Sequence, residues 1–242
     1  MARKSAQPYR RLDPDMVAQT ADRLRDRVAE RFPDSGLAGV AEELAAVAGV
    51  AGRRTRALTK PYLGLRFLVF LVLVSGLSAQ VWIGSQVDWS ALHAGADPVV
   101  LTPVIESGVN LMVLMFAGMW FLLTLEERLR RQRIQTWLHQ LRAFAHVVDM
   151  HQLTKDPTVI LNQGPRTPSS PVRSMTRFSL ARYLEYCAEM LALTGKLSAL
   201  MAGETEDHVV IAAAGDVETL CTDLGRKVWQ KIMILGELDE KS

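Results

Sequence analysis

Residues 62–83 are YLGLRFLVFLVLVSGLSAQVWI, and residues 99–125 are VVLTPVIESGVNLMVLMFAGMWFLLTL. A helix rises about 1.5 Å per residue, so each stretch is long enough to cross about 30 Å of hydrocarbon. The rest of the chain is polar enough to lie in water. The sequence therefore predicts an all-α integral membrane protein, in which a two-helix transmembrane hairpin is joined to a cytoplasmic helical bundle.

The position of basic residues predicts the orientation of this hairpin. Arginine and lysine flank both spans, whereas the segment between them, residues 84–98, contains neither. Because positive charge stays on the cytoplasmic side, we expect a multi-pass inner (plasma) membrane protein with both termini in the cytoplasm. Trp82 and Trp89 would lie at the outer interface, and Arg66 would extend toward the inner headgroups. The flanking basic residues are Arg53, Arg54, Arg56, Lys60, Arg128, Arg130, Arg131 and Arg133.

Composition limits the remaining possibilities. The 242 residues carry a net charge of only +2, so no strong basic field points to nucleic acid. The two cysteines, Cys187 and Cys221, occupy apolar positions of predicted helices and are interpreted as reduced core residues. The first apolar stretch begins too far along the chain for a cleaved signal peptide, so it is expected in the mature protein.

Three parts are predicted. Residues 1–60 form an N-terminal cytoplasmic helical hairpin with a basic juxtamembrane segment, and residues 61–125 form the transmembrane hairpin. Residues 126–242 form the cytoplasmic bundle, which is interrupted by a Pro/Ser-rich connector at 157–175.

The N-terminal part shows helical periodicity. Asp13 is the expected N-cap of the first helix, with Pro14 at its first position. Its charged face is either solvated or lies on a membrane surface, although its acidic residues weaken the second interpretation. A second helix is expected over about residues 37–52. The apolar positions of the first helix are Val17, Ala21, Leu24, Val28 and Phe32.

The second span continues without a helix breaker into the cytoplasmic part, which predicts one helix of about fifty residues. Two more helices are expected over about residues 176–201 and 206–235, with Thr205 as the N-cap of the last. Their apolar faces are wide, and those near Tyr186 and Trp229 have no evident cover within one chain. The apolar stripe after the second span consists of Ile134, Trp137, Leu138, Leu141, Phe144, Ala145 and Val148.

A polar face interrupts the second span. Thr102, Glu106 and Asn110 recur every four residues, so they share one side of the helix, and Gln80 lies at a similar depth on the first span. Such a face should be turned toward the partner helix, another subunit or water. Glu106 is either a hydrogen-bonded group that holds helices together, a member of a carboxylate ring in a cation path, or an outer-interface residue that reaches water.

A second polar stripe follows in the cytoplasmic half of the same helix: His139, Arg142, His146 and Asp149. A hydrogen-bonded interface and a pH-sensing histidine pair are both compatible with this spacing. A metal site is not expected, because Arg142 repels cations and the histidines stand two turns, about 10 Å, apart.

Polar residues also cluster where this helix is expected to end: His151, Thr154, Lys155 and Asp156. They either stop the helix ahead of Pro157 or form a binding loop for an anion or a protein partner.

No nucleotide-binding loop, nucleophile elbow, zinc-protease motif or calcium loop is present, and no catalytic constellation stands out. We therefore expect a non-enzymatic oligomeric inner-membrane protein whose cytoplasmic module mediates self-assembly or partner docking. The alternative is an oligomeric ion channel lined by the polar face of the second span and gated by the bundle. The expected partners are the lipid bilayer and further copies of the chain, with a cytoplasmic protein as a further candidate. No cofactor or metal is expected.

Overall fold

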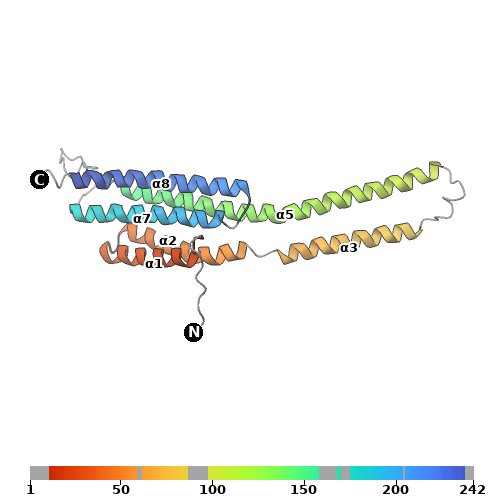
Figure 1. Ribbon diagram of the computed structural model, residues 1–242, viewed down its shortest axis with the longest axis horizontal. Coiled ribbons are helices and arrows are strands. Elements are labelled where there is room, and N and C mark those ends of the chain that lie inside the picture. The colour runs from red at the N-terminus through yellow and green to blue at the C-terminus, as the bar shows by residue number, and fades with distance from the viewer. Residues whose placement is uncertain are drawn as a thin grey trace, which may run out of the picture. The chain divides into compact units, whose positions relative to one another are not determined.

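The computed structural model describes residues 11–58, 62–86, 98–157, 168–169, 175–203 and 205–237. In these ranges the chain is helical and contains no strand, which confirms the predicted all-α class (Figure 1). Trp89 and most of the connector at 157–175 lie outside the described residues. The helices are α1 Pro14–Arg31, α2 Gly36–Leu58, α3 Leu63–Gln86, α5 Pro98–Leu153, α7 Arg177–Ala202 and α8 His208–Glu237.

The chain divides into two compact units. Residues 60–132 form one, which we call the hairpin unit, and residues 1–59 with 133–242 form the other, the bundle unit. Helix α5 contributes to both, so the predicted helix of about fifty residues is confirmed as one element. The three predicted domain boundaries stay a prediction.

Helix α7 is the centre of the bundle unit. It packs against α8, α1 and α2, and buried side chains follow it from Leu180 to Met201. Thr176 is its N-cap, since its side chain accepts a hydrogen bond from the Ser179 backbone N–H at 3.1 Å. Helix α5 adds its apolar stripe to the same core, where Ile134, Leu138, Leu141, Ala145 and Val148 are buried.

The N-terminal hairpin begins as predicted and ends later than predicted. Asp13 caps α1 and Pro14 follows it, while the turn into α2 places Asp34 at a positive φ of 58°. Helix α2 continues to Leu58 instead of ending near Gly52. A glycine ends a helix by turning left-handed, and Gly52 does not do so. A Cβ at Gly52 would lie 3.2 Å from Cβ of Pro14, so this glycine permits a close approach of α1.

The start of α8 corrects the sequence analysis. The expected N-cap, Thr205, is not the capping residue. Asp207 is, because its Oδ1 accepts a hydrogen bond from the Val209 N–H at 2.9 Å. Thr205 instead accepts one from the Asp207 N–H at 3.1 Å and so holds the capping residue in place. Both residues favour N-caps, and sequence spacing alone does not separate them.

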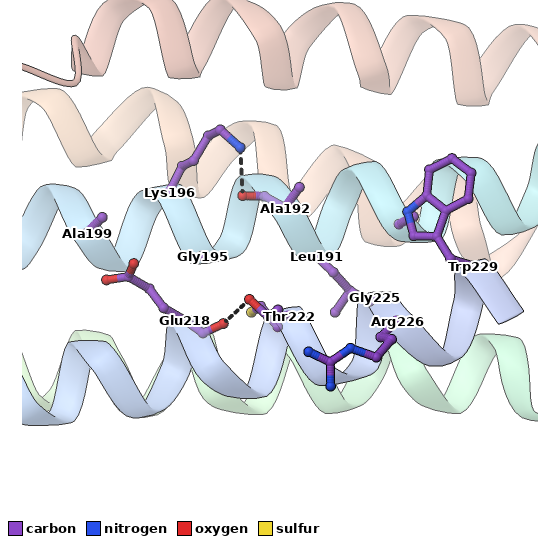
Figure 2. Close-up of a pocket in the computed structure, with 12 residues that line it drawn as sticks. Leu191, Ala192, Gly195, Lys196, Ala199, Glu218, Thr222, Gly225, Arg226 and Trp229 are labelled. Carbon is purple, nitrogen blue, oxygen red and sulfur yellow. Dashed lines mark hydrogen bonds between the residues drawn. The ribbon is translucent and has the colours of Figure 1, made fainter.

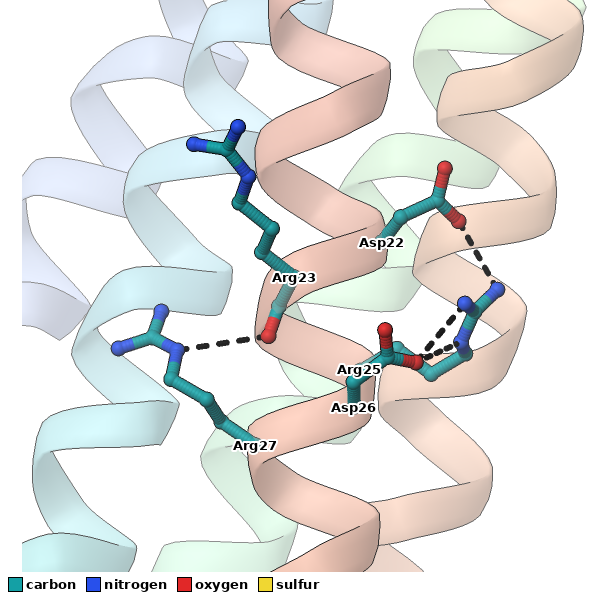
Figure 3. Close-up of polar contacts among 5 residues, drawn as sticks. All are labelled: Asp22, Arg23, Arg25, Asp26 and Arg27. Atoms are coloured by element: carbon teal, nitrogen blue, oxygen red, sulfur yellow. Dashed lines mark hydrogen bonds and ion pairs between the residues drawn. The ribbon is translucent and has the colours of Figure 1, made fainter.

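On the charged face of α1, an arginine pairs with neighbouring carboxylates (Figure 3). Arg25 pairs with Asp22 at 2.9 Å and with Asp26 at 2.8 Å, and all three side chains are exposed. These pairs fit the solvated-face interpretation. Arg27 also forms an ion pair with Glu189 of α7, which links α1 to the centre of the bundle.

The hairpin unit consists of α3 and the first part of α5. A Cβ at Gly76 would lie 2.6 Å from Sδ of Met115, so the two helices approach closely at this glycine. Glu126 joins them at the other end, because it accepts a hydrogen bond from the Tyr62 N–H at 3.3 Å and lies 3.4 Å from Nε of Arg66. By length and composition, Leu63–Gln86 and part of Ile105–Leu153 can each cross a membrane.

Candidate functional site

The surface of the hairpin unit is the most unusual feature of the chain. Large apolar side chains point away from both helices, and Leu63, Leu114 and Trp120 are each more than 70% exposed. Soluble proteins rarely carry a continuous apolar surface of this kind. Other members of this surface are Phe67, Phe70, Leu77, Val81, Trp82, Val113, Phe116 and Phe121.

The predicted polar face of the second span lies on this exposed surface. Thr102, Glu106 and Asn110 are all exposed, so α3 does not cover them. Gln80 is half-buried, and its side-chain oxygen is enclosed without a hydrogen-bond partner in the described part of the chain. The structure therefore does not bring Gln80 into hydrogen-bond contact with Glu106, and the three residues on α5 are left facing outward.

The second polar stripe, His139, Arg142, His146 and Asp149, is divided between two environments. His139 and His146 are exposed, and Arg142 lies 3.7 Å from Oδ2 of Asp216 on α8. Asp149 instead is half-buried and accepts a hydrogen bond from the side chain of Gln152. Across the ranges that the structure describes, no group of three or more His, Cys, Asp or Glu residues is placed to hold a metal ion.

The residues at the end of α5 are also separated. His151 lies against Gly36, where a Cβ would meet its Nε2 at 2.8 Å, and its Nδ1 lies 2.9 Å from the Val147 carbonyl oxygen. Lys155 lies over the ring of Tyr183 at 5.3 Å. Thr154 is exposed and Asp156 is half-buried. This arrangement resembles a helix end packed into its surroundings more than an open binding loop.

A buried polar cluster that sequence analysis missed closes this end of the bundle. The ammonium of Lys231 donates to the backbone carbonyl of Gln152 at 3.0 Å and to its side-chain oxygen at 2.7 Å. Gln152 is only 1% exposed and donates in turn to Asp149 at 2.5 Å. Burial lowers the pKa of Lys231, while Asp156 and Asp149 oppose that shift. The cation stabilises the carboxyl end of α5.

A groove runs between α7 and α8, with an accessible volume of about 530 Å³ (Figure 2). Small residues such as Ala192, Gly195 and Ala199 form its floor, and Trp229, which is 55% exposed, stands at its end. Two of the polar groups drawn there donate to backbone oxygens of their own helices: Thr222 to the Glu218 carbonyl at 2.9 Å and Lys196 to the Ala192 carbonyl at 3.5 Å.

The expectation of an uncovered apolar face at Tyr186 is wrong. Tyr186 is only 5% exposed, because the ring of Phe32 packs edge-on at 6.2 Å and the guanidinium of Arg27 lies over it at 5.7 Å. The N-terminal helix thus covers one of the two apolar faces for which the sequence showed no cover within one chain. Trp229 is the exposed aromatic side chain that remains on α8.

No family model, no curated protein and no solved structure matches this chain.

Proposed function

We propose that this chain is a non-enzymatic membrane protein that self-associates through its hairpin unit and presents the bundle unit on the cytoplasmic side of the inner membrane. The exposed apolar surface of α3 and α5 is the observation that carries this proposal. Contact of such a surface with lipid costs no free energy, whereas its exposure to water is unfavourable because apolar side chains are poorly hydrated.

Charge supports the orientation. Arginines follow the second span at 128, 130, 131 and 133, and residues 84–98 contain no arginine or lysine. The rule that positive charge remains inside then places the bundle unit, which contains both termini, in the cytoplasm.

Self-association follows from Glu106 and Asn110. Both are exposed on α5 within one chain, so in a bilayer they would face hydrocarbon. A carboxyl group at that depth is costly unless another polar group covers it. The same face of a second copy supplies carboxyl and amide groups at matching depths, and polar contacts of this kind hold transmembrane helices together.

The test is the mass of the detergent-solubilised particle, measured by light scattering after gel filtration. We expect the wild-type chain to resist alkaline extraction from membranes and to run as an oligomer. Glu106→Leu should shift the particle toward the monomer, whereas Glu106→Gln, which keeps hydrogen bonding, should retain most of the oligomer. Ser107→Ala, a neighbouring exposed position off the polar face, is the control. A monomeric wild-type particle would contradict the proposal.

An oligomeric ion channel is the second candidate, and the exposed line Thr102, Glu106 and Asn110 favours it. Two helices cannot enclose a pore, so this function requires several copies. Purified oligomer in liposomes should then pass cations, and Glu106→Gln should alter the current because it removes a charge from the path. A well-formed oligomer without conductance would leave self-assembly and docking as the function.

A further inference from the structure

A groove with an accessible volume of about 550 Å³ lies within the hairpin unit, at the end where α3 begins. One part of its wall is apolar and consists of Leu65, Val69, Leu122 and Leu123. In the sequence these residues belong to the two spans, so the groove opens at the boundary between apolar and polar chain.

The other part of the wall is charged and consists of Arg66, Glu126, Glu127 and Arg130. Arg66 reaches Glu126 through its Nε, at 3.4 Å, and its side chain is still 63% exposed. Its terminal NH₂ groups make no hydrogen bond within the described residues. A guanidinium held at one edge in this way can present its remaining donors to an anion.

Glu126 also stabilises the start of α3, because it accepts a hydrogen bond from the Tyr62 backbone N–H. Helix α3 has no acidic residue of its own in its first turn, so the Glu126 carboxylate from α5 interacts with the positive end of its dipole. The two glutamates offset part of the arginine charge. The groove is therefore suited to one negative charge more than to a multiply charged group.

We propose that this groove binds the headgroup of a monoanionic phospholipid, with the phosphodiester between Arg66 and Arg130 and an acyl chain along Leu65 and Val69. The proposal rests on the membrane insertion proposed above. Apolar and basic walls side by side distinguish a lipid from a soluble anion, which would gain nothing from the leucines. Basic pockets between transmembrane helices on the cytoplasmic side recognise anionic headgroups by this chemistry.

Native mass spectrometry of the full chain in detergent tests the proposal by titration with phosphatidylglycerol or phosphatidylcholine of the same acyl chains. We expect phosphatidylglycerol to bind about tenfold more tightly, which is the effect of one good charge-assisted contact. Arg130→Gln should remove most of this preference. Arg128→Gln makes the same charge change two residues away and outside the groove, so it should leave the preference within about twofold. Excess inorganic phosphate should not displace the lipid.

Equal binding of the two lipids by the wild-type chain would overturn the proposal, and this comparison needs no variant that might misfold. An equal loss in Arg128→Gln would overturn it as well, because it would show a diffuse charge effect. Displacement by inorganic phosphate would show a bare anion site instead of a lipid site. Flotation with vesicles tests membrane insertion separately: a chain that floats but shows no headgroup preference overturns only this inference.

Discussion

Cys187 illustrates how much a single position depends on its surroundings. Its thiol is fully buried in the bundle, and burial raises its pKa from an ordinary value of 9.0 to about 12. Cys221, on α8, is less deeply buried, and burial raises its pKa to about 11. Both cysteines are free and buried, as the sequence analysis expected.

These shifts predict alkaline destabilisation. In the unfolded chain the Cys187 thiol ionises near pH 9, and in the folded chain near pH 12, so its contribution is complete below pH 9 and is lost as pH rises toward 12. The loss can reach about 4 kcal/mol, since each unit of pKa corresponds to about 1.4 kcal/mol. We expect Cys187→Ala to flatten the fall in unfolding free energy between pH 8 and 11.

The measurement is denaturant unfolding at the two pH values under reducing conditions, followed by circular dichroism. Cys221→Ala should flatten the fall less, because its pKa is raised less. Lys231 acts in the opposite sense: its lowered pKa makes its contribution grow with pH up to about 10.5. Burial is the largest cause of that shift, and Cys187 is a smaller cause than Asp156 and Asp149, so most of the Lys231 contribution is kept in Cys187→Ala. An unchanged pH dependence in Cys187→Ala would contradict the assignment.

Lys231 supplies a second prediction. Lys231→Met removes the donor to two oxygens of the buried Gln152, and each buried acceptor left unpaired costs about 1–3 kcal/mol. We expect a loss of roughly that size in the free energy of unfolding. Lys227→Met, one turn earlier on an exposed position, is the matched control and should change stability by less than about 0.5 kcal/mol. Equal effects would mean that the cluster does not hold the end of α5.

Among the helices, α1 has the least expected role. Sequence periodicity indicates an amphipathic helix, but not which apolar face it covers. In the structure its C-terminal end brings Phe32 to Tyr183 and Tyr186 of α7, with ring centroids 5.5 and 6.2 Å apart. The ion pair between Arg27 and Glu189 closes the same junction.

This junction predicts unequal effects for two aromatic residues that look alike in the sequence. Tyr186→Ala should cost about 3–5 kcal/mol, as removal of a buried aromatic ring does. Trp229→Ala should cost under about 1 kcal/mol, because more than half of that side chain is already exposed. Thermal unfolding of both variants measures the difference. Similar losses would mean that Trp229 is covered in the folded protein by something outside this chain.

The bundle unit as a whole is built from the two segments that precede and follow the hairpin unit in the sequence. Residues 1–59 and 133–242 share one hydrophobic core, which contains no buried residue from the described part of 60–132. The core and the apolar spans therefore serve separate purposes. The core stabilises the bundle unit, and in the proposed function the spans provide a surface for lipid.

Replacement of residues 60–132 by a flexible Gly/Ser linker of about twenty residues should thus leave a bundle that folds without detergent. We expect helical circular dichroism, one cooperative thermal transition and full solubility at low micromolar concentration. The intact chain without detergent is the comparison and should precipitate. Loss of cooperative unfolding in the linked protein would show that the bundle needs the hairpin unit for its stability.

The number and order of the described helices, the Asp13 cap, the long α5 and the two apolar spans all follow from composition and from periods of three and four residues, because these features depend on neighbours within one or two turns. The end of α2 and the cap of α8 do not follow from these periods. The outward polar face of α5 was also predictable as a face, though not its lack of cover by α3. Three contacts were not predictable from the sequence: the packing of Phe32 over Tyr186, the hydrogen bonds of Lys231 to Gln152 and the pairing of Arg66 with Glu126. Each joins residues sixty or more positions apart. Such pairs form only where packing of whole helices brings their side chains together, and the free energy that selects them comes from burial that no local pattern contains.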